Sequence, residues 1–233
     1  RAISEHIRYG GYPRVIVTHD IELKKTILRD LYETILLKDI ARTFSIEDIA
    51  TLERLVKYLS HTIGGLLHFE NLSTVINISF PALKKYLHAM EQSYLIKTVH
   101  PHFTNKTKEL VKQPKIYFLD TGLRNAIAKE FSVNGKVFEN YVLTELLKRG
   151  YDPKYWRTKA KAEVDFIIET EKGIIPIEVK LQANKIERSL FSFINQYKPK
   201  KAIVVSYKGE KKKFKKNNCL IIITDLQGLR ELI

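Results

Sequence analysis

Cysteine, methionine and tryptophan are almost absent from this chain of 233 residues, which contains one of each. With Cys219 as the only thiol, no intramolecular disulfide can form, and a zinc site built from several cysteines is excluded. No apolar run approaches the ~18 residues of a transmembrane helix, and the N-terminus lacks the order of a signal peptide. These absences favour a cytoplasmic protein that does not enter a membrane.

A phosphate-binding P-loop is absent too, because the pattern G-x-x-x-x-G-K-S/T does not occur. The chain begins with Arg1, and its only methionine is Met90. We therefore expect a fragment, or a chain that lacks its N-terminal part.

Positive charge is abundant and unevenly distributed. Lysine and arginine number 40 against 26 acidic residues, a net charge of +14. Residues 1–100 hold 13 basic and 11 acidic side chains, whereas residues 101–233 hold 27 and 15. Such a concentration favours a polyanionic partner, most often nucleic acid, with a solvated lysine-rich surface as the alternative. The 44% of hydrophobic residues is enough for a core, so wholesale disorder is excluded.

The first 119 residues predict helices and a short hairpin. Residues 1–44, with the turn signal Gly10–Pro13, predict a helical connector whose apolar stripe includes Ile27 and Leu28. Residues 45–119 predict three helices, the first from Ser45 or Ile46, and then two strands. This is the order of a winged helix-turn-helix module. Its recognition helix is predicted at 80–92, because Ser79 suits the N-cap and Pro81 the first turn. The nucleic-acid contacts are predicted at Lys84, Lys85, Lys106 and Lys108. Protein docking is the alternative role for such a module.

Residues 120–233 alternate between helical and strand patterns, which predicts an α/β domain. A helix is expected at 136–149 and strands at 162–169 and 174–180. Further on, a helix is expected at 189–197 and strands at 202–206 and 220–224. The lysine run 211–216 is expected at a solvated hairpin tip.

Two carboxylates are predicted to face each other on one hairpin of this domain. The turn at 170–173 ends in glycine, a common hairpin connection. If Glu169 pairs with Ile174, then Asp165 lies opposite Glu178, at a Cβ distance of ~4.5–5.5 Å. Alternation places the apolar residues of both strands on the other, buried face: Val164, Phe166, Ile168, Ile175, Ile177 and Val179.

Opposed carboxylates need a cation between them. Lys180, which alternation places on the same side as Glu178, offers one positive charge, and Mg²⁺ or Mn²⁺ would suit the hard oxygen ligands. Glu139 lies on a mostly apolar helix face, where a glutamate normally costs stability, so it is a candidate third ligand. The alternative is an ordinary hairpin with surface ion pairs.

Glu139, Asp165 and the run Glu178–Lys180 resemble the PD-(D/E)XK motif of restriction-endonuclease-like nucleases, with Val164 in place of the proline. The resemblance implies that Glu139, Asp165 and Glu178 bind Mg²⁺ or Mn²⁺ and that Lys180 stabilises the attacking hydroxide. Arg157, just before the hairpin, is a candidate phosphate contact.

The resemblance extends over nearly the whole chain, through an ordered series of motifs: Gly10–Pro13, Lys38–Ile40, Tyr117–Leu123, Phe138–Asn140, Tyr155–Arg157 and Glu163–Phe166. In this order they are similar to the C-terminal half of archaeal and bacterial AAA-type ATPases. That resemblance implies a helical connector, a winged helix at 45–119 and a nuclease-like mixed sheet flanked by helices at 120–233. It implies DNA as partner and an upstream ATPase domain holding the ATP site, and it leaves the oligomeric state open. Two functions remain open: a metal-dependent nuclease, or a non-catalytic DNA- or protein-docking module of the ATPase.

Overall fold

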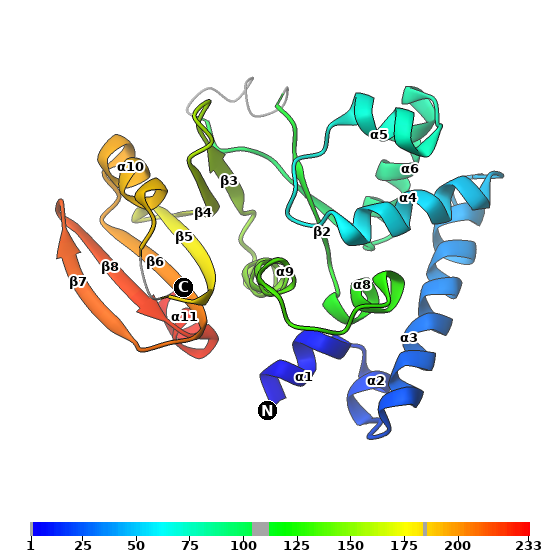
Figure 1. Ribbon diagram of the computed structural model, residues 1–233, viewed down its shortest axis with the longest axis horizontal. Coiled ribbons are helices and arrows are strands. Elements are labelled where there is room, and N and C mark those ends of the chain that lie inside the picture. Colours follow the sequence, from blue (N-terminus) through cyan, green and yellow to red (C-terminus); the bar gives the residue numbers. More distant parts are fainter. Residues whose placement is uncertain (1, 104–111, 184–185) are drawn as a thin grey trace. The chain divides into compact units, whose positions relative to one another are not determined.

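The computed structural model describes residues 2–103, 112–183 and 186–233 (Figure 1). It divides into two compact units. Unit 1 comprises residues 1–98 and 113–133, and unit 2 comprises residues 99–112 and 134–233. The protein has a helical N-terminal region and a mixed sheet flanked by helices, as predicted. In the described ranges, no helix combines the length and apolarity needed to cross a bilayer.

Unit 1 begins with a series of helices, α1 (Ala2–Tyr9), α2 (Pro13–Val17) and α3 (Ile21–Thr34). The last continues into the π-helical segment η1 (Ile35–Arg42). Asp20 caps α3, because its carboxylate accepts a hydrogen bond from the backbone N–H of Leu23. Ile27 and Leu28 are buried, as the predicted apolar stripe requires.

Three further helices follow, α4 (Ile49–His61), α5 (Phe69–Ile76) and α6 (Phe80–Gln92). Strands β1 (Ile96–Val99) and β2 (Lys115–Phe118) then pair in a two-stranded sheet. Ser79 caps α6 as expected. The predicted start of the first helix at residue 45 or 46 was wrong. Ser45 has a φ of 49°, which no α-helix contains, and the helix begins after its N-cap, Asp48.

The motifs Gly10-Gly11 and Asp120–Gly122 meet inside unit 1. Asp120 caps α8 (Thr121–Ala128) through the Leu123 N–H and also accepts a hydrogen bond from the Gly11 N–H, both at 2.8 Å. Burial raises the pKa of Asp120, and these hydrogen bonds partly offset the effect. Helix α8, which the sequence assigned to the second domain, therefore packs against α1, α3 and α4 of unit 1.

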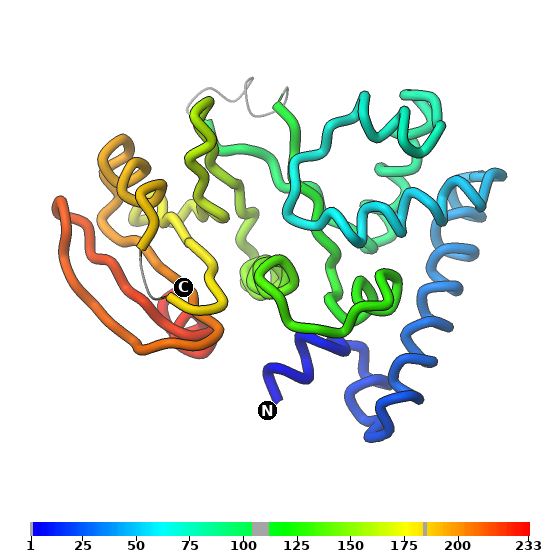
Figure 2. The backbone as a smooth tube through the Cα atoms, in the orientation of Figure 1, coloured from blue at the N-terminus to red at the C-terminus, as the bar shows by residue number. Residues whose placement is uncertain are grey.

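Unit 2 is built on a mixed sheet with the strand order β3-β4-β5-β6-β8-β7. Its strands are β3 (Lys154–Arg157), β4 (Glu163–Thr170), β5 (Gly173–Gln182), β6 (Lys201–Lys208), β7 (Lys212–Lys216) and β8 (Cys219–Thr224). Strands β3, β4 and β5 run antiparallel, and β6 and β8 continue parallel to β5. Strand β7 returns antiparallel beside β8 at the end of the sheet (Figure 2).

Helices cover both faces of this sheet. Leu190 and Phe193 of α10 (Arg188–Tyr197) pack in a buried cluster with Val204 and Ile221. Helix α9 (Gly135–Leu147) packs on β5, and α11 (Leu226–Leu232) packs on β6 and β8. Phe138 of α9 contacts the ring of Tyr207, which alternation places on the opposite face from Val204. The sheet is therefore a core between helical layers.

Two strands, β3 and β7, were not predicted. Strand β3 has only four residues and no apolar alternation. All five residues of β7 are exposed, and four of them are lysines, which are depleted in strands. Both strands form because a longer neighbour supplies their backbone partners. The prediction that Val164 faces the same side as Phe166 was also wrong. Val164 packs in the α10 cluster, next to a register shift between β3 and β4.

Glu145 ties α9 to α11. Its carboxylate is 3% exposed and receives Arg230 Nη2 at 2.8 Å and Lys148 Nζ at 3.1 Å. Burial raises the pKa of Glu145, but these two cations outweigh it and hold the pKa below its usual value. Glu145 therefore contributes structure rather than chemistry.

Glu145→Gln is expected to lower the free energy of unfolding by about 2 kcal/mol near neutral pH, because it removes a buried charge from its cations. A depressed folded-state pKa stabilises above the unfolded-state pKa, and this contribution is lost as the pH falls through the folded-state value. The difference in free energy of unfolding between the wild type and Glu145→Gln should therefore become smaller as the pH falls. Urea titrations at several pH values measure this difference. Exposed Glu231→Gln is the control. A deficit that does not change with pH would contradict this explanation.

Candidate functional site

The predicted hairpin exists in its predicted register. Glu169 pairs with Ile174, and the ladder between β4 and β5 runs back to Phe166 and Ile177. There it stops, because the half-buried Asp165 turns its carboxylate onto the neighbouring strand. Asp165 Oδ2 accepts a hydrogen bond of 2.7 Å from the Val179 N–H. This bond holds Asp165 beside the middle residue of the run from Glu178 to Lys180.

Glu178 is a buried carboxylate at 3% exposure. Its Oε1 lies 3.0 Å from Lys180 Nζ, while Oε2 has no hydrogen-bond partner among the described residues. Burial raises the pKa of Glu178, and the Lys180 ammonium partly offsets the effect. A buried carboxylate oxygen without a donor is costly, so this atom needs a partner that the described side chains do not supply: a cation, a ligand donor or a water molecule.

Lys180 lies between two carboxylates. Besides Glu178, it donates a hydrogen bond to Glu187, the exposed residue just before α10. Burial lowers the pKa of Lys180, but the carboxylates of Glu187 and Glu178 outweigh it and raise the pKa above its usual value. Its ammonium is thus firmly charged. The sequence did not predict Glu187, whose contact with Lys180 joins β5 to the start of α10.

Glu139 lies on α9, the helix that packs against β5, and is 6% exposed. The expectation of a glutamate on a buried helix face is therefore confirmed. Its Oε2 accepts a hydrogen bond of 3.1 Å from Lys136 Nζ. Among the described residues, no three His, Cys, Asp or Glu side chains are grouped closely enough to hold a metal ion. Metal binding by Glu139, Asp165 and Glu178 stays a prediction.

The side chains predicted to contact nucleic acid differ in which groups of the protein they already contact. Lys84 and Lys85 are exposed on α6, but Lys84 Nζ lies over the Phe80 ring at 4.6 Å and Lys85 Nζ donates to the Ser45 carbonyl at 2.9 Å. Arg157 Nη1 pairs with Glu163 Oε2 at 2.7 Å. Lys106 and Lys108 lie outside the described residues. In unit 2, Arg157 is thus already partly neutralised.

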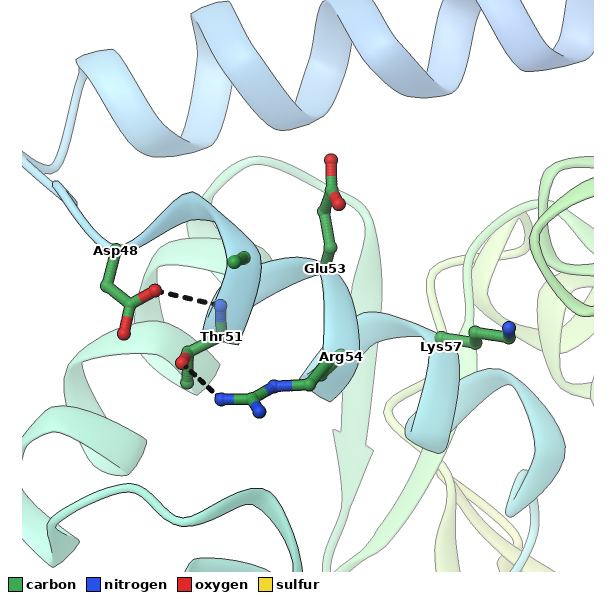
Figure 3. A pocket seen from close by; sticks show the side chains of 6 residues that line it. Asp48, Thr51, Glu53, Arg54 and Lys57 are labelled. Carbon is green, nitrogen blue, oxygen red and sulfur yellow. Dashed lines mark hydrogen bonds between the residues drawn. The ribbon is translucent and has the colours of Figure 1, made fainter.

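A hollow of about 460 Å³ at the start of α4 is not a comparable site. Asp48 accepts from the Thr51 N–H at 3.0 Å, and Arg54 donates to the Thr51 hydroxyl at 2.7 Å. Glu53 and Lys57 point away from these groups in different directions (Figure 3). The polar groups here cap a helix and do not converge on a ligand.

Comparison with known proteins identifies two domain families. The model of a domain of unknown function, DUF8612, matches residues 1–134, and that of a second one, DUF4143, matches residues 134–226. Domains of the second kind are commonly found at the C-terminus of AAA-ATPase-like proteins. No solved structure matches the chain.

The curated relatives are themselves uncharacterized. A protein of Haemophilus influenzae is 30% identical over 185 residues, which are 77% of this chain and 46% of that protein. One of Methanocaldococcus jannaschii is 27% identical over 201 residues, 82% of this chain and 45% of its own length. The chain thus spans about half the length of the curated relatives it matches. Because the first family model covers residues 1–134 of the 233, the protein belongs to the DUF8612 family, whose function is unknown.

Proposed function

We propose that unit 2 is a DNA-directed, metal-dependent nuclease of the PD-(D/E)XK type. The observation that carries this proposal is Glu178, a buried carboxylate with Oε2 unbonded among the described residues and a charged lysine 3.0 Å from Oε1. A buried acceptor next to a fixed cation suits a site that neutralises a phosphodiester and a metal ion together.

The residues of the hairpin would divide the work. Asp165 and Glu178 would offer the hard oxygens that Mg²⁺ or Mn²⁺ prefers, and such an ion would supply Lewis-acid activation of the phosphodiester. Asp165 is held in place by the Val179 N–H, so its orientation is fixed before substrate arrives. Lys180 carries a fixed positive charge for the phosphate oxygens and the attacking hydroxide.

The arrangement of elements supports the finer fold assignments. In unit 2, helix α9, three antiparallel strands, helix α10 and the parallel strand β6 follow in the order expected of a restriction-endonuclease-like domain. Asp165 and Glu178 stand on the two strands of one hairpin, as the motif requires. In unit 1, three helices followed by paired β1 and β2 support a winged helix.

The experiment is cleavage of labelled linear, nicked and branched DNA with Mg²⁺, with Mn²⁺ and with a chelator. Metal-dependent cutting by the wild-type chain, lost in Asp165→Ala, is the expected result. DNA binding without cutting on any substrate would contradict the nuclease proposal and favour a docking function.

A separate observation favours docking to a protein by unit 1. Four large apolar residues in and around α2 are at least half exposed: Ile16 at 54%, Val17 at 72%, Ile21 at 51% and Leu23 at 50%. Exposed apolar clusters mark interaction surfaces. Because the curated relatives are about twice as long and DUF4143 domains commonly follow AAA-ATPase-like regions, we propose an ATPase domain as the partner.

Val17→Asp combined with Ile21→Asp is expected to weaken binding to the separately expressed ATPase domain of a homologue at least tenfold in calorimetry, because charge is unfavourable in an apolar interface. Leu37, another exposed apolar residue, gives the control substitution Leu37→Asp. If the wild type, the double variant and Leu37→Asp bound the ATPase domain with equal affinity, this docking surface would be contradicted.

A further inference from the structure

Strand β7 presents a row of exposed lysines at the end of the sheet. Lys212, Lys213, Lys215 and Lys216, here called the lysine strip, surround Phe214, and every residue of the strand is exposed. Neighbouring like charges repel, and lysine is a poor strand former, so local preference opposes this strand. A strand that persists against its own preference is a candidate for a functional surface.

A tight turn and a side-chain hydrogen bond position the lysine strip. Lys216 pairs with Cys219, and the two residues between them, Asn217 and Asn218, both have positive φ, at 51° and 60°. This is the conformation of a tight type I′ hairpin turn, which asparagine tolerates. Asn217 also donates a hydrogen bond of 2.7 Å to Asn195 of α10. The turn fixes the lysines in register with β8.

The lysines divide between the two faces of the sheet. Lys212 and Lys216 stand opposite Ile223 and Cys219, on the face that α10 covers. Lys213 and Lys215 stand on the other face, where Lys213 lines a hollow of about 310 Å³ that Gly228 of α11 also borders. Residues two apart on a strand lie about 6.8 Å apart. The strip therefore consists of two short rows of charge, one on each face of the same sheet edge.

Most of this charge is uncompensated. Among the described residues, Lys213 and Lys215 form no ion pair, and Lys216 Nζ lies over the Phe191 ring at 3.9 Å. Lys212 pairs with Glu210 at 3.1 Å, but both side chains are more than 60% exposed. Exposed pairs of this kind are weak and easily exchanged. The strip can therefore bind external anions.

The edge itself adds donors. Strand β7 is last in the sheet order, so within the described residues no strand pairs with its outer side. Its outward N–H groups are free to donate to phosphate oxygens. Phe214, 38% exposed between the lysines, offers a face on which a base can stack.

We infer that the lysine strip is the nucleic-acid backbone contact of unit 2 and holds DNA without reading its sequence. Lysines along both faces of one sheet edge, with Phe214 between Lys212 and Lys216, fit a linear phosphodiester chain that follows this edge. A membrane surface would need a larger apolar face to insert than Phe214 alone supplies. This inference rests on the proposed function, for which it provides the substrate-holding surface.

The test is fluorescence anisotropy of a labelled duplex and its single strand, in chelator so that no cutting occurs, over about 50–200 mM salt. Lys213→Gln with Lys215→Gln keeps an unbranched aliphatic stem with a polar end while removing two charges. Lys38→Gln with Lys57→Gln is the control, because both lysines are exposed and lie in unit 1. The strip variant is expected to bind about tenfold more weakly at ~0.1 M salt and to lower the salt-dependence slope by about two, while the control binds as wild type does.

Each outcome of this experiment either supports or overturns the inference. Equal weakening on duplex and single strand supports the backbone contact for both, and weakening on one form supports it for that form. If the strip variant binds DNA as tightly as the wild type, the inference is overturned. The proposed nuclease would still stand if Asp165→Ala abolished cutting. No binding of DNA by the wild-type chain, or strip-dependent binding only to phosphatidylserine vesicles, also overturns it. Aggregation of the variant with unchanged binding would show that the lysines only protect a sheet edge.

Discussion

Replacing Gly122 by alanine is expected to destabilise unit 1 by about 3 kcal/mol or more. A Cβ atom at this position would lie 2.1 Å from the Tyr9 carbonyl carbon and oxygen and 2.4 Å from the Gly10 nitrogen. All three are backbone atoms, which cannot rotate away as a side chain does. Helix α8 would have to separate from the end of α1, and a calorimetric melt should fall by roughly 10 °C or more.

Gly135→Ala is the matched control for this prediction. Gly135 is the first residue of α9, and a Cβ there would meet no atom within 4 Å. Because alanine is the better helix former, the substitution is expected to leave stability unchanged or to raise it by up to about 1 kcal/mol. A Gly122→Ala protein that melts with the wild type would show that the α1–α8 contact is looser than the structure has it.

The same contact joins two of the sequence motifs, the one that begins at Gly10 and the one that contains Asp120–Gly122. A Cβ at Gly10 would lie 2.1 Å from Asp120 Oδ1, and the Gly11 N–H donates to the same carboxylate. The glycines and Asp120–Gly122 are thus two sides of one close approach. Their order along the chain supported a family resemblance, but their function here is to hold unit 1 together.

Local patterns predicted the elements whose cause is local. Ser79 followed by Pro81 predicted the start of α6, because a cap and a first-turn proline act within one helical turn. The turn before Gly173 predicted the β4–β5 register, because a short turn fixes the pairing of its strands. Strand β7 could not be predicted, because its pairing with β8 determines it. The side chain of Val164 was assigned to the wrong face, because the irregular pairing of β3 and β4 lies next to it.

In the candidate site, too, local patterns predicted some features, and others depend on contacts between separate elements. Glu178 and Lys180 are two residues apart on one strand, so alternation alone predicted that they share a side. Their distance of 3.0 Å agrees. Glu187 was not predicted, because no local periodicity relates it to Lys180, which lies on a different element. Asp165 was predicted opposite Glu178, whereas its carboxylate bonds to the Val179 N–H, a choice that periodicity does not determine.

Asp165→Ala and Lys180→Ala are each expected to lower the rate of metal-dependent DNA cleavage about 10³-fold or more, because removing one electrostatic group from such a site has effects of this size. The measurement is single-turnover cleavage of the best substrate at saturating enzyme. Lys159→Ala, which removes an exposed lysine from the neighbouring β3–β4 connection, is the control and should cut at the wild-type rate.

Asp165→Asn separates chemistry from folding at this site. An asparagine oxygen can still accept the hydrogen bond of the Val179 N–H, so the hairpin keeps its anchor, while the negative charge that a metal ion requires is gone. The variant is therefore expected to melt with the wild type and yet to cut as poorly as Asp165→Ala. If Asp165→Asn cuts normally and only Asp165→Ala fails, then Asp165 fastens β4 to β5 and holds no metal. The proposed mechanism would then be wrong at its first ligand, whatever activity the chain shows.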